Sequence, residues 1–216
     1  MKTLVQCDFD GTITDKDVSF LLLDAFADSS WRQMLKDYQA DGISVGLFNT
    51  RAFAMIKADK QTLLDFVLNS DEVKIRPGFP ELLDYCSRNG LEFVIVSNGQ
   101  DIYIEAILNK LGINNIEFFA ARSSFGPGGL DVKYIGPDGS ELLDGFKESY
   151  TELFLSRGYR VIYVGNGVSD IYPARRAHHV FAIDDLLERC HETNLNCTPF
   201  NDLNDVVKGL ERLQPG

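Results

Sequence analysis

Five short apolar runs, each rich in Val, Ile or Phe, are spread along the chain with helix-length stretches between most of them. They read TLVQCDF (3–9), LEFVIVS (91–97), IEFFAA (116–121), RVIYVG (160–165) and HVFAI (179–183). Strands that alternate with helices form parallel sheets, because a parallel crossover needs a dozen or more residues. Continuous apolarity, as at 93–96 and 161–164, indicates that both faces of the sheet are covered. The pattern predicts an α/β fold with a doubly wound parallel sheet.

One interval breaks this alternation. Residues 15–75 contain apolar side chains at helical spacing, among them Phe20, Leu35, Phe53 and Val67. We therefore expect a small helical cap (15–75) inserted after the first strand, and an α/β core made of residues 1–14 and 76–216. Inside the core, residues 123–143 are rich in glycine and carry a Pro-Asp-Gly-Ser turn, which predicts a loop and a β-hairpin.

The charge balance narrows the possible partners. The chain has 21 basic and 32 acidic residues and a net charge of -11, with no basic run that would follow a phosphate backbone. Nucleic acid and membrane surfaces are therefore not expected as partners, whereas a small anionic substrate is compatible with a cleft made locally positive by a metal ion or a few lysines. The N-terminal MKTLVQCDFDG is too short in apolar residues for a signal peptide or a membrane span, so we expect a cytoplasmic location.

Two aspartates follow the first apolar run, in VQCDFDGTIT (5–14). At the carboxyl end of a central strand, side chains project into the crevice where ligands bind in open α/β sheets. Asp8 and Asp10 are two residues apart and leave the strand on the same side, while Phe9 points into the core. Because two close carboxylates repel each other, the pair predicts either a divalent metal ion or a raised pKa on one member.

The residues after the pair also fit a ligand site. Gly11 permits a sharp turn, and Thr12 adds a hydroxyl donor. A strand that runs into an Asx turn is the simpler explanation for Asp-x-Asp alone. The longer pattern Asp-x-Asp-Gly-Thr is expected by chance on the order of once in a thousand chains of this length.

DFDGTIT resembles the first motif of the haloacid dehalogenase-like phosphohydrolases. The resemblance implies that Asp8 is phosphorylated and that Asp10 serves as acid and base. That family also carries a Ser or Thr at the end of the second strand, a Lys further along, and an acidic cluster after a later strand. Candidates for all three occur here in the same order, so the resemblance spans essentially the whole core.

Ser97, Asn98 and Gly99 end the second apolar run, where a hydroxyl and backbone N–H groups are able to hold phosphate oxygens. Lys147, in DGFKESY, lies at a predicted helix start, an unfavourable end for a cation unless an anion is near. A polar strand cap and an exposed lysine explain these residues equally well when each is taken alone.

VGNGVSD follows a strand with a compact loop whose Asn166 and Asp170 offer oxygen ligands. The resemblance implies a Mg²⁺ ion bound by Asp8, Asp10 through its backbone carbonyl, Asn166 and Asp170. It also implies phosphate binding by Thr12, Ser97, Asn98, Gly99 and Lys147. Most relatives have aspartate where this chain has Asn166, so we expect weaker Mg²⁺ binding, or else Asp170 carries the carboxylate role alone.

The helical cap after the first motif resembles the subgroup that includes phosphoserine phosphatases and the methionine-salvage phosphatases of 2-hydroxy-3-keto-5-methylthiopentenyl-1-phosphate. Residues 186–203 are similar to the C-terminal region of the salvage enzymes, and Asp17 stands where phosphoserine-specific relatives carry glutamate. In one departure, residues 123–143 lack the cysteine-rich stretch of the salvage enzymes. Candidate cap contacts to the substrate are Phe20, Trp31, Lys36 and Arg51, although such residues are more often cap core or surface.

The resemblance therefore implies a Mg²⁺-dependent phosphomonoester hydrolase that acts on a small phosphorylated metabolite through an aspartyl-phosphate. The methionine-salvage enol-phosphate is the first candidate substrate. A phosphoserine phosphatase-like enzyme and a weakly active phosphate-binding protein are the alternatives. The sequence carries no pattern that specifies an oligomeric state.

Overall fold

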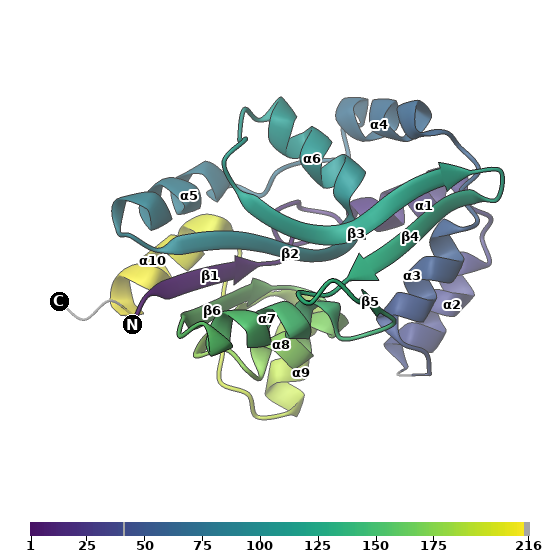
Figure 1. Cartoon of the computed structure of the whole chain (residues 1–216). Helices are drawn as coiled ribbons and strands as arrows, with labels where there is room; N and C mark the ends of the chain where they lie inside the picture. The colour runs from purple at the N-terminus through teal and green to yellow at the C-terminus, as the bar shows by residue number, and fades with distance from the viewer. Residues whose placement is uncertain (41, 214–216) are drawn as a thin grey trace.

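The computed structural model describes residues 1–40 and 42–213 of the chain (Figure 1). Its centre is an eight-stranded sheet with the order β5-β4-β3-β2-β1-β6-β7-β8. The strands are β1 (Thr3–Cys7), β2 (Glu92–Gln100), β3 (Glu117–Gly126), β4 (Gly129–Ile135), β5 (Glu141–Leu142), β6 (Arg160–Gly165), β7 (His179–Ala182) and β8 (Thr198–Pro199). The pairs from β3 across to β8 are parallel, whereas β3–β4 and β4–β5 are antiparallel. The predicted parallel sheet is confirmed, with an antiparallel extension at one edge.

Helices cover both faces of this sheet. The helices of the core are α5 (Phe79–Arg88), α6 (Asp101–Lys110), α7 (Phe146–Ser156), η1 (Val168–Asp170), α8 (Ile171–Ala174), α9 (Asp184–Glu192) and α10 (Leu203–Leu213). In Figure 1, α5, α6 and α10 lie on one side of the sheet, and α7, α8 and α9 lie on the other. In the part of the chain described, no helix is both long and apolar enough to cross a membrane.

The central strand β1 is buried because its neighbours cover it from all directions. It pairs with β2 on one side and β6 on the other, and Val5 lies opposite Phe93 and Ile162. Val5 and Cys7 are fully buried. Since β1 is flanked by strands and helices, whatever follows Cys7 at its carboxyl end begins inside the molecule rather than on its surface.

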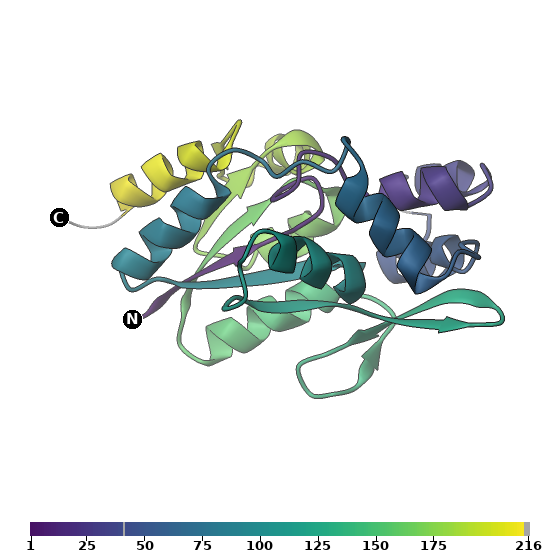
Figure 2. The same ribbon diagram turned by 90° about the horizontal axis from the view of Figure 1, so that it is seen from above.

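Four helices separate β1 from α5, as the apolar spacing of residues 15–75 predicts. They are α1 (Val18–Phe26), α2 (Trp31–Gln39), α3 (Val45–Phe53) and α4 (Lys60–Asn69). Side chains of Asp17, Ser44 and Asp59 cap the starts of α1, α3 and α4 by accepting backbone N–H groups. An antiparallel bridge between Thr14 and Ile75 brings the two ends of this segment together. Figure 2 shows the helices beyond the carboxyl ends of the central strands, and the division into cap and core stays a prediction.

The β3–β4 hairpin extends past the central strands of the sheet and lies along these cap helices (Figure 2). The amide of Leu130 donates to the carbonyl of Ile56 at 3.1 Å, which ties the hairpin to the segment that follows α3. Gly129 has a φ of +110°, and a Cβ there would lie 2.5 Å from the same carbonyl oxygen. Glycine at this position therefore allows the close contact between the hairpin and the cap.

Candidate active site

The turn after β1 places its aspartates at the edge of the sheet. The amide of Asp8 still donates to the Val164 carbonyl at 2.9 Å, so strand pairing continues one residue past β1. The carbonyl of Phe9 then accepts the amides of residues 12–14 at 2.8 to 3.2 Å, and Phe9 itself is fully buried. Gly11 has a φ of +73°, which glycine adopts without strain. The predicted arrangement, with Phe9 inward and the aspartates at the strand end, is confirmed.

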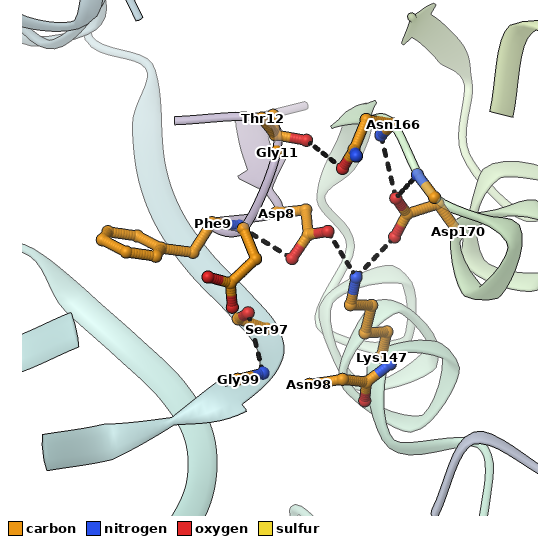
Figure 3. Close-up of polar contacts among 12 residues, drawn as sticks. Asp8, Phe9, Gly11, Thr12, Ser97, Asn98, Gly99, Lys147, Asn166 and Asp170 are labelled. Atoms are coloured by element: carbon orange, nitrogen blue, oxygen red, sulfur yellow. Dashed lines mark hydrogen bonds and ion pairs between the residues drawn. The ribbon is translucent and has the colours of Figure 1, made fainter. Parts of the chain in front are cut away.

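Asp8 forms a buried charged group with Lys147 and Asp170 (Figure 3). Lys147 Nζ lies 2.7 Å from Asp8 Oδ2 and 2.6 Å from Asp170 Oδ1, and all three side chains are at most 7 % exposed. Lys147 is in the first turn of α7, as its sequence position predicts. Burial alone would lower the pKa of Lys147, but Asp170 and Asp8 together raise it above its usual value, so the ammonium stays charged.

Burial also raises the pKa of Asp8, to about 7, and Lys147 opposes this rise. The other carboxylate oxygen of Asp8, Oδ1, accepts the amide of Phe9 at 2.7 Å. Ionisation of the Asp8 carboxyl group is therefore costly in this site, and the Lys147 ammonium is the cation that favours it.

Asp10 has different partners. Its Oδ1 accepts the amide of Val18, at the start of cap helix α1, at 3.0 Å, and its Oδ2 accepts the Tyr103 hydroxyl from core helix α6. Burial raises the pKa of Asp10 to about 8, and the nearby carboxylate of Asp17 adds to the rise. The sequence predicted a metal ion or a raised pKa on one member from the mutual repulsion of the pair, whereas here the pKa of both members is raised, and burial is the main cause.

Asp170 is enclosed by donors. In addition to Lys147, its carboxylate accepts the Tyr163 hydroxyl at 2.5 Å and the amides of Asn166 and Gly167 at 2.9 and 2.8 Å. It is fully buried and is not among the residues that line the cavity. Direct metal coordination by Asp170, predicted from the sequence, would require one of these bonds to be given up.

Thr12, which the resemblance assigns to phosphate binding, contacts another residue of the site. Its hydroxyl donates to Asn166 Oδ1 at 2.8 Å, and Thr12 does not line the cavity, whereas Asn166 does (Figure 3). Gly11 lies against the same asparagine, since a Cβ at Gly11 would be 2.3 Å from Asn166 Nδ2. Thr12 therefore fixes the orientation of Asn166 in this structure, and no phosphate contact from Thr12 is evident from its geometry.

The remaining predicted phosphate-binding residues do face the cavity. Ser97, Asn98, Gly99 and Lys147 all line it. The Ser97 hydroxyl accepts the amide of Gly99 at 3.1 Å. These residues line the same cavity as Asp8 and Asp10, so the structure brings together four of the five residues predicted to bind phosphate.

The carbonyl of Asn98 is held by two side chains that the sequence did not single out. Tyr134, from β4, donates its hydroxyl at 2.7 Å, and Asn49, from cap helix α3, donates its amide at 3.3 Å. Asn49 also donates to the Tyr134 hydroxyl at 2.6 Å. Both residues are almost fully buried. The cap, the hairpin and strand β2 at Asn98 therefore meet at one hydrogen-bonded junction.

The cap supplies most of the apolar side chains that line the cavity. The lining side chains from this segment that are apolar or aromatic are Phe20, Leu35, Tyr38, Val45 and Phe48. Of the four cap contacts proposed from the sequence, Phe20 lines the cavity. Trp31 is buried in the cap core at 3 % exposure, and neither Lys36 nor Arg51 is among the described lining residues.

The oxygen atoms available near Asp8 are of the chemical type that binds Mg²⁺. The Asp8 carboxylate, the Asp10 carbonyl and the Asn166 amide oxygen are hard ligands of the type that Mg²⁺ prefers. Asn166 Oδ1 accepts one hydrogen bond, which leaves a second lone pair. Among residues 1–40 and 42–213 there is no cluster of three or more His, Cys, Asp or Glu side chains arranged for a metal. The donor set therefore fits Mg²⁺ with a smaller negative charge than a site built from several carboxylates.

Comparison with known proteins adds to this geometry. A model of the haloacid dehalogenase-like hydrolase family matches residues 5–175. The 2-hydroxy-3-keto-5-methylthiopentenyl-1-phosphate phosphatase of Geobacillus thermodenitrificans is 30% identical over 96% of this chain and 95% of its own length. The enzyme of the same name from Brevibacillus brevis is 27% identical over 99% of this chain and 97% of its own. A solved phosphoserine phosphatase with a phospho-aspartyl intermediate analogue superposes with a TM-score of 0.72 at 18% identity, over 96% of this chain and 98% of its own, which shows a shared fold.

Proposed function

The chain belongs to the haloacid dehalogenase-like hydrolase family, and from that membership we propose that it is a phosphomonoester hydrolase that works through a phosphorylated Asp8. The observation that carries the proposal is the buried contact of Asp8 with Lys147 at the wall of a cavity. We propose a small phosphorylated metabolite as the substrate. The cytoplasmic location expected from the sequence stays a prediction.

In the first half-reaction, an oxygen of Asp8 attacks phosphorus, and the bond from phosphorus to the leaving oxygen breaks. A carboxylate and a phosphate repel each other, so Lys147 is needed to keep Asp8 ionised and to offset charge on the phosphoryl oxygens. Asp170 holds the ammonium of Lys147 from its other side at 2.6 Å. We therefore assign Asp170 a positioning role through Lys147.

Asp10 supplies the proton transfers. It donates a proton to the leaving oxygen and then accepts a proton from the water that attacks phosphorus in the aspartyl-phosphate. This second attack breaks the bond between Asp8 and phosphorus and releases inorganic phosphate. A pKa of about 8, raised first by burial, suits a group that must both donate and accept a proton near neutral pH.

We propose that residues at the cavity hold both the phosphate and the metal ion. Ser97, the Asn98 amide and Lys147 would orient the phosphoryl group, and the Gly99 amide would join them by exchanging its bond to the Ser97 hydroxyl for one to phosphate. Asp8, the Asp10 carbonyl and Asn166 would hold Mg²⁺, which when bound offsets the negative charge of the phosphate.

The cavity favours the methionine-salvage compound over phosphoserine. Among the described lining residues, Lys147 is the one Lys, Arg or His side chain, and it is already bound to two carboxylates. A substrate with a second anionic group, such as the carboxylate of phosphoserine, would find no further basic side chain among the described lining residues. The leaving group of 2-hydroxy-3-keto-5-methylthiopentenyl-1-phosphate is uncharged and ends in an apolar methylthio group, which matches the apolar side chains of the cap.

The experiment is phosphate release from both candidate substrates, with Mg²⁺ and with a chelator. We expect Mg²⁺-dependent release from the enol-phosphate, much slower release from phosphoserine, and a loss of at least about 10⁴-fold in kcat for Asp8→Asn, because the nucleophile is removed. Asp84→Asn is the matched control, since Asp84 pairs with Arg88 on the exposed face of α5.

Each outcome has a distinct meaning. Wild-type turnover retained by Asp8→Asn would disprove the nucleophile assignment. Faster hydrolysis of phosphoserine would disprove the substrate assignment and leave the phosphatase assignment standing. A wild-type protein that binds the enol-phosphate without hydrolysing it would instead be the weakly active binding protein considered from the sequence.

A further inference from the structure

Tyr103 is a buried tyrosine whose hydroxyl lies between three parts of the site. It is in the first turn of α6 and is fully buried. The hydroxyl donates to Asp10 Oδ2 and lies 2.8 Å from the Ser19 hydroxyl of cap helix α1. Ser19 and Asp10 line the cavity, whereas Tyr103 is not among the lining residues. The phenol is thus placed to act on Asp10 from behind, without touching a substrate.

The backbone at Gly99 is shaped around this contact. A Cβ at Gly99 would lie 1.9 Å from the Tyr103 hydroxyl oxygen and 2.2 Å from Asp10 Oδ2. Both distances are far below any van der Waals contact, so a side chain at residue 99 would force the phenol and the carboxylate apart. The absence of a side chain at Gly99 therefore has a specific effect, which is to leave room for the Tyr103–Asp10 pair.

The hydrogen bond restricts how Asp10 is able to rotate. The Val18 amide holds Oδ1 at 3.0 Å, and the phenol holds Oδ2, so the plane of the carboxyl group is fixed by two donors from two different helices. Each carboxyl oxygen has a second lone pair, which stays available for proton transfer. Without the phenol, the carboxyl group is held at one oxygen only and gains rotational freedom.

We propose that Tyr103 is a positioning residue that aims the carboxyl group of Asp10 at the leaving oxygen and, in the second half-reaction, at the attacking water. This inference rests on the proposed phosphatase function. Tyr103 itself exchanges no proton with the substrate and forms no bond to phosphorus. Its loss should impair the steps that need proton transfer and spare the attack of Asp8 when the leaving group needs no proton.

The test is Tyr103→Phe with two aryl phosphates of similar shape, phenyl phosphate and 4-nitrophenyl phosphate. Phenolate is a basic leaving group that needs a proton, whereas 4-nitrophenolate leaves without one. We expect kcat for phenyl phosphate to fall by about 10- to 100-fold with little change in KM. With 4-nitrophenyl phosphate, the first half-reaction should keep its rate while the second slows. The variant should then release a burst of nearly one 4-nitrophenolate per active site. The phosphoryl-enzyme that accumulates should be recovered when the reaction is quenched with acid.

Two further variants separate positioning from folding. Ser19→Ala removes a neighbour of the phenol and should give the same dependence on the leaving group, with a smaller effect. Tyr159→Phe is the matched control, because the Tyr159 hydroxyl binds the Glu92 carboxylate at 2.6 Å, away from the cavity. It should hydrolyse both substrates as wild type does.

The outcomes are distinguishable from those of the proposed function. If wild type is active but Tyr103→Phe loses equal activity on both substrates and shows no burst, the positioning role is wrong and the phosphatase assignment stands. If Tyr103→Phe does not fold, Ser19→Ala decides, and an unchanged dependence on the leaving group overturns the inference. A wild type without phosphatase activity on any candidate phosphate overturns the proposed function and this inference with it.

Discussion

Asp8 and Asp10 are two residues apart and almost equally buried, but their surroundings differ in charge and in origin. Asp8 contacts the ammonium of Lys147, which in turn contacts Asp170, and these partners come from the core. Asp10 contacts a phenol and a backbone amide, and the amide belongs to cap helix α1. A cation therefore compensates the first carboxylate, and neutral donors compensate the second.

This difference separates two chemical roles within one short motif. A nucleophile must be ionised when the substrate arrives, and a directly bound ammonium favours that state. An acid–base group must gain and lose a proton, and neutral donors leave both states accessible. Burial raises the pKa of both groups, to about 7 for Asp8 and about 8 for Asp10, so the identity of the neighbours, rather than depth, distinguishes them.

The largest effect is expected from removing the Lys147 ammonium, which compensates Asp8 but not Asp10. Lys147→Met leaves Asp8 and Asp170 buried side by side without a positive charge, and removing one partner of a buried ionic group costs about 3–5 kcal/mol. We expect a fall of that size in the free energy of unfolding at pH 8 in urea, together with loss of phosphatase activity. Lys208→Met is the control, because Lys208 pairs with Asp205 at the surface, where such pairs contribute about 0–1 kcal/mol.

A double variant checks the cause of the destabilisation. Adding Asp170→Asn to Lys147→Met removes one of the two uncompensated carboxylates, and it should recover part of the lost stability. If Lys147→Met is as stable as Lys208→Met, the buried ionic group does not hold the nucleophile as described.

The second test concerns Asp10 and pH. Because its pKa in the folded protein is raised from 3.8 to about 8, the folded state binds more protons than the unfolded state between these values. Stability from this group is therefore present at low pH and is lost as pH rises towards 8. Without metal, we expect Asp10→Asn to be more stable than wild type by at least about 2 kcal/mol at pH 8, and the difference to vanish near pH 4.

A carboxylate with the opposite shift serves as the control. Hydrogen bonds from the Ser30 side chain and amide lower the pKa of the exposed Asp28. Asp28→Asn should therefore lose a little stability above pH 4 and none below it, which is the reverse of Asp10→Asn. Parallel pH profiles for the two variants would contradict the assignment of a raised pKa to Asp10.

The sequence predicts the side chains around Asp8 better than those around Asp10. Asp8 and Lys147 follow a strand or begin a helix, and the topology of a parallel sheet brings such positions to one edge. Tyr103 lies in DIYIEAI, where its spacing is typical of an ordinary buried helix face, and no local pattern shows that its hydroxyl reaches Asp10. Asn49 and Tyr134 are missed for the same reason, since their contacts depend on how the cap packs on the hairpin.

For two site residues the structure shows side-chain partners that the sequence did not predict, and their phosphate and metal contacts stay predictions. Thr12 lies in the first motif, and its hydroxyl binds Asn166. Asp170 lies after β6 as predicted, and four donors surround its carboxylate. Residue spacing fixes which loops meet, whereas the choice among neighbouring donors depends on side-chain rotamers that spacing does not specify. The sequence predicted a hairpin within residues 123–143. It did not predict that this hairpin packs against the cap helices.

The smallest effect is expected from substituting Asn166, a proposed Mg²⁺ ligand near Asp8. Its Oδ1 is a neutral oxygen that accepts the Thr12 hydroxyl, and aspartate at this position would keep that acceptor while adding a negative charge. Since ligand charge raises the affinity for a divalent cation, Asn166→Asp should bind Mg²⁺ about tenfold more tightly by calorimetry, about 1.4 kcal/mol. Asn69→Asp adds the same charge at the exposed end of α4 and should leave the affinity unchanged. Equal affinities in all three proteins would mean that residue 166 does not ligate the metal, and the Asp8 carboxylate and the Asp10 carbonyl would then be the protein's remaining ligands.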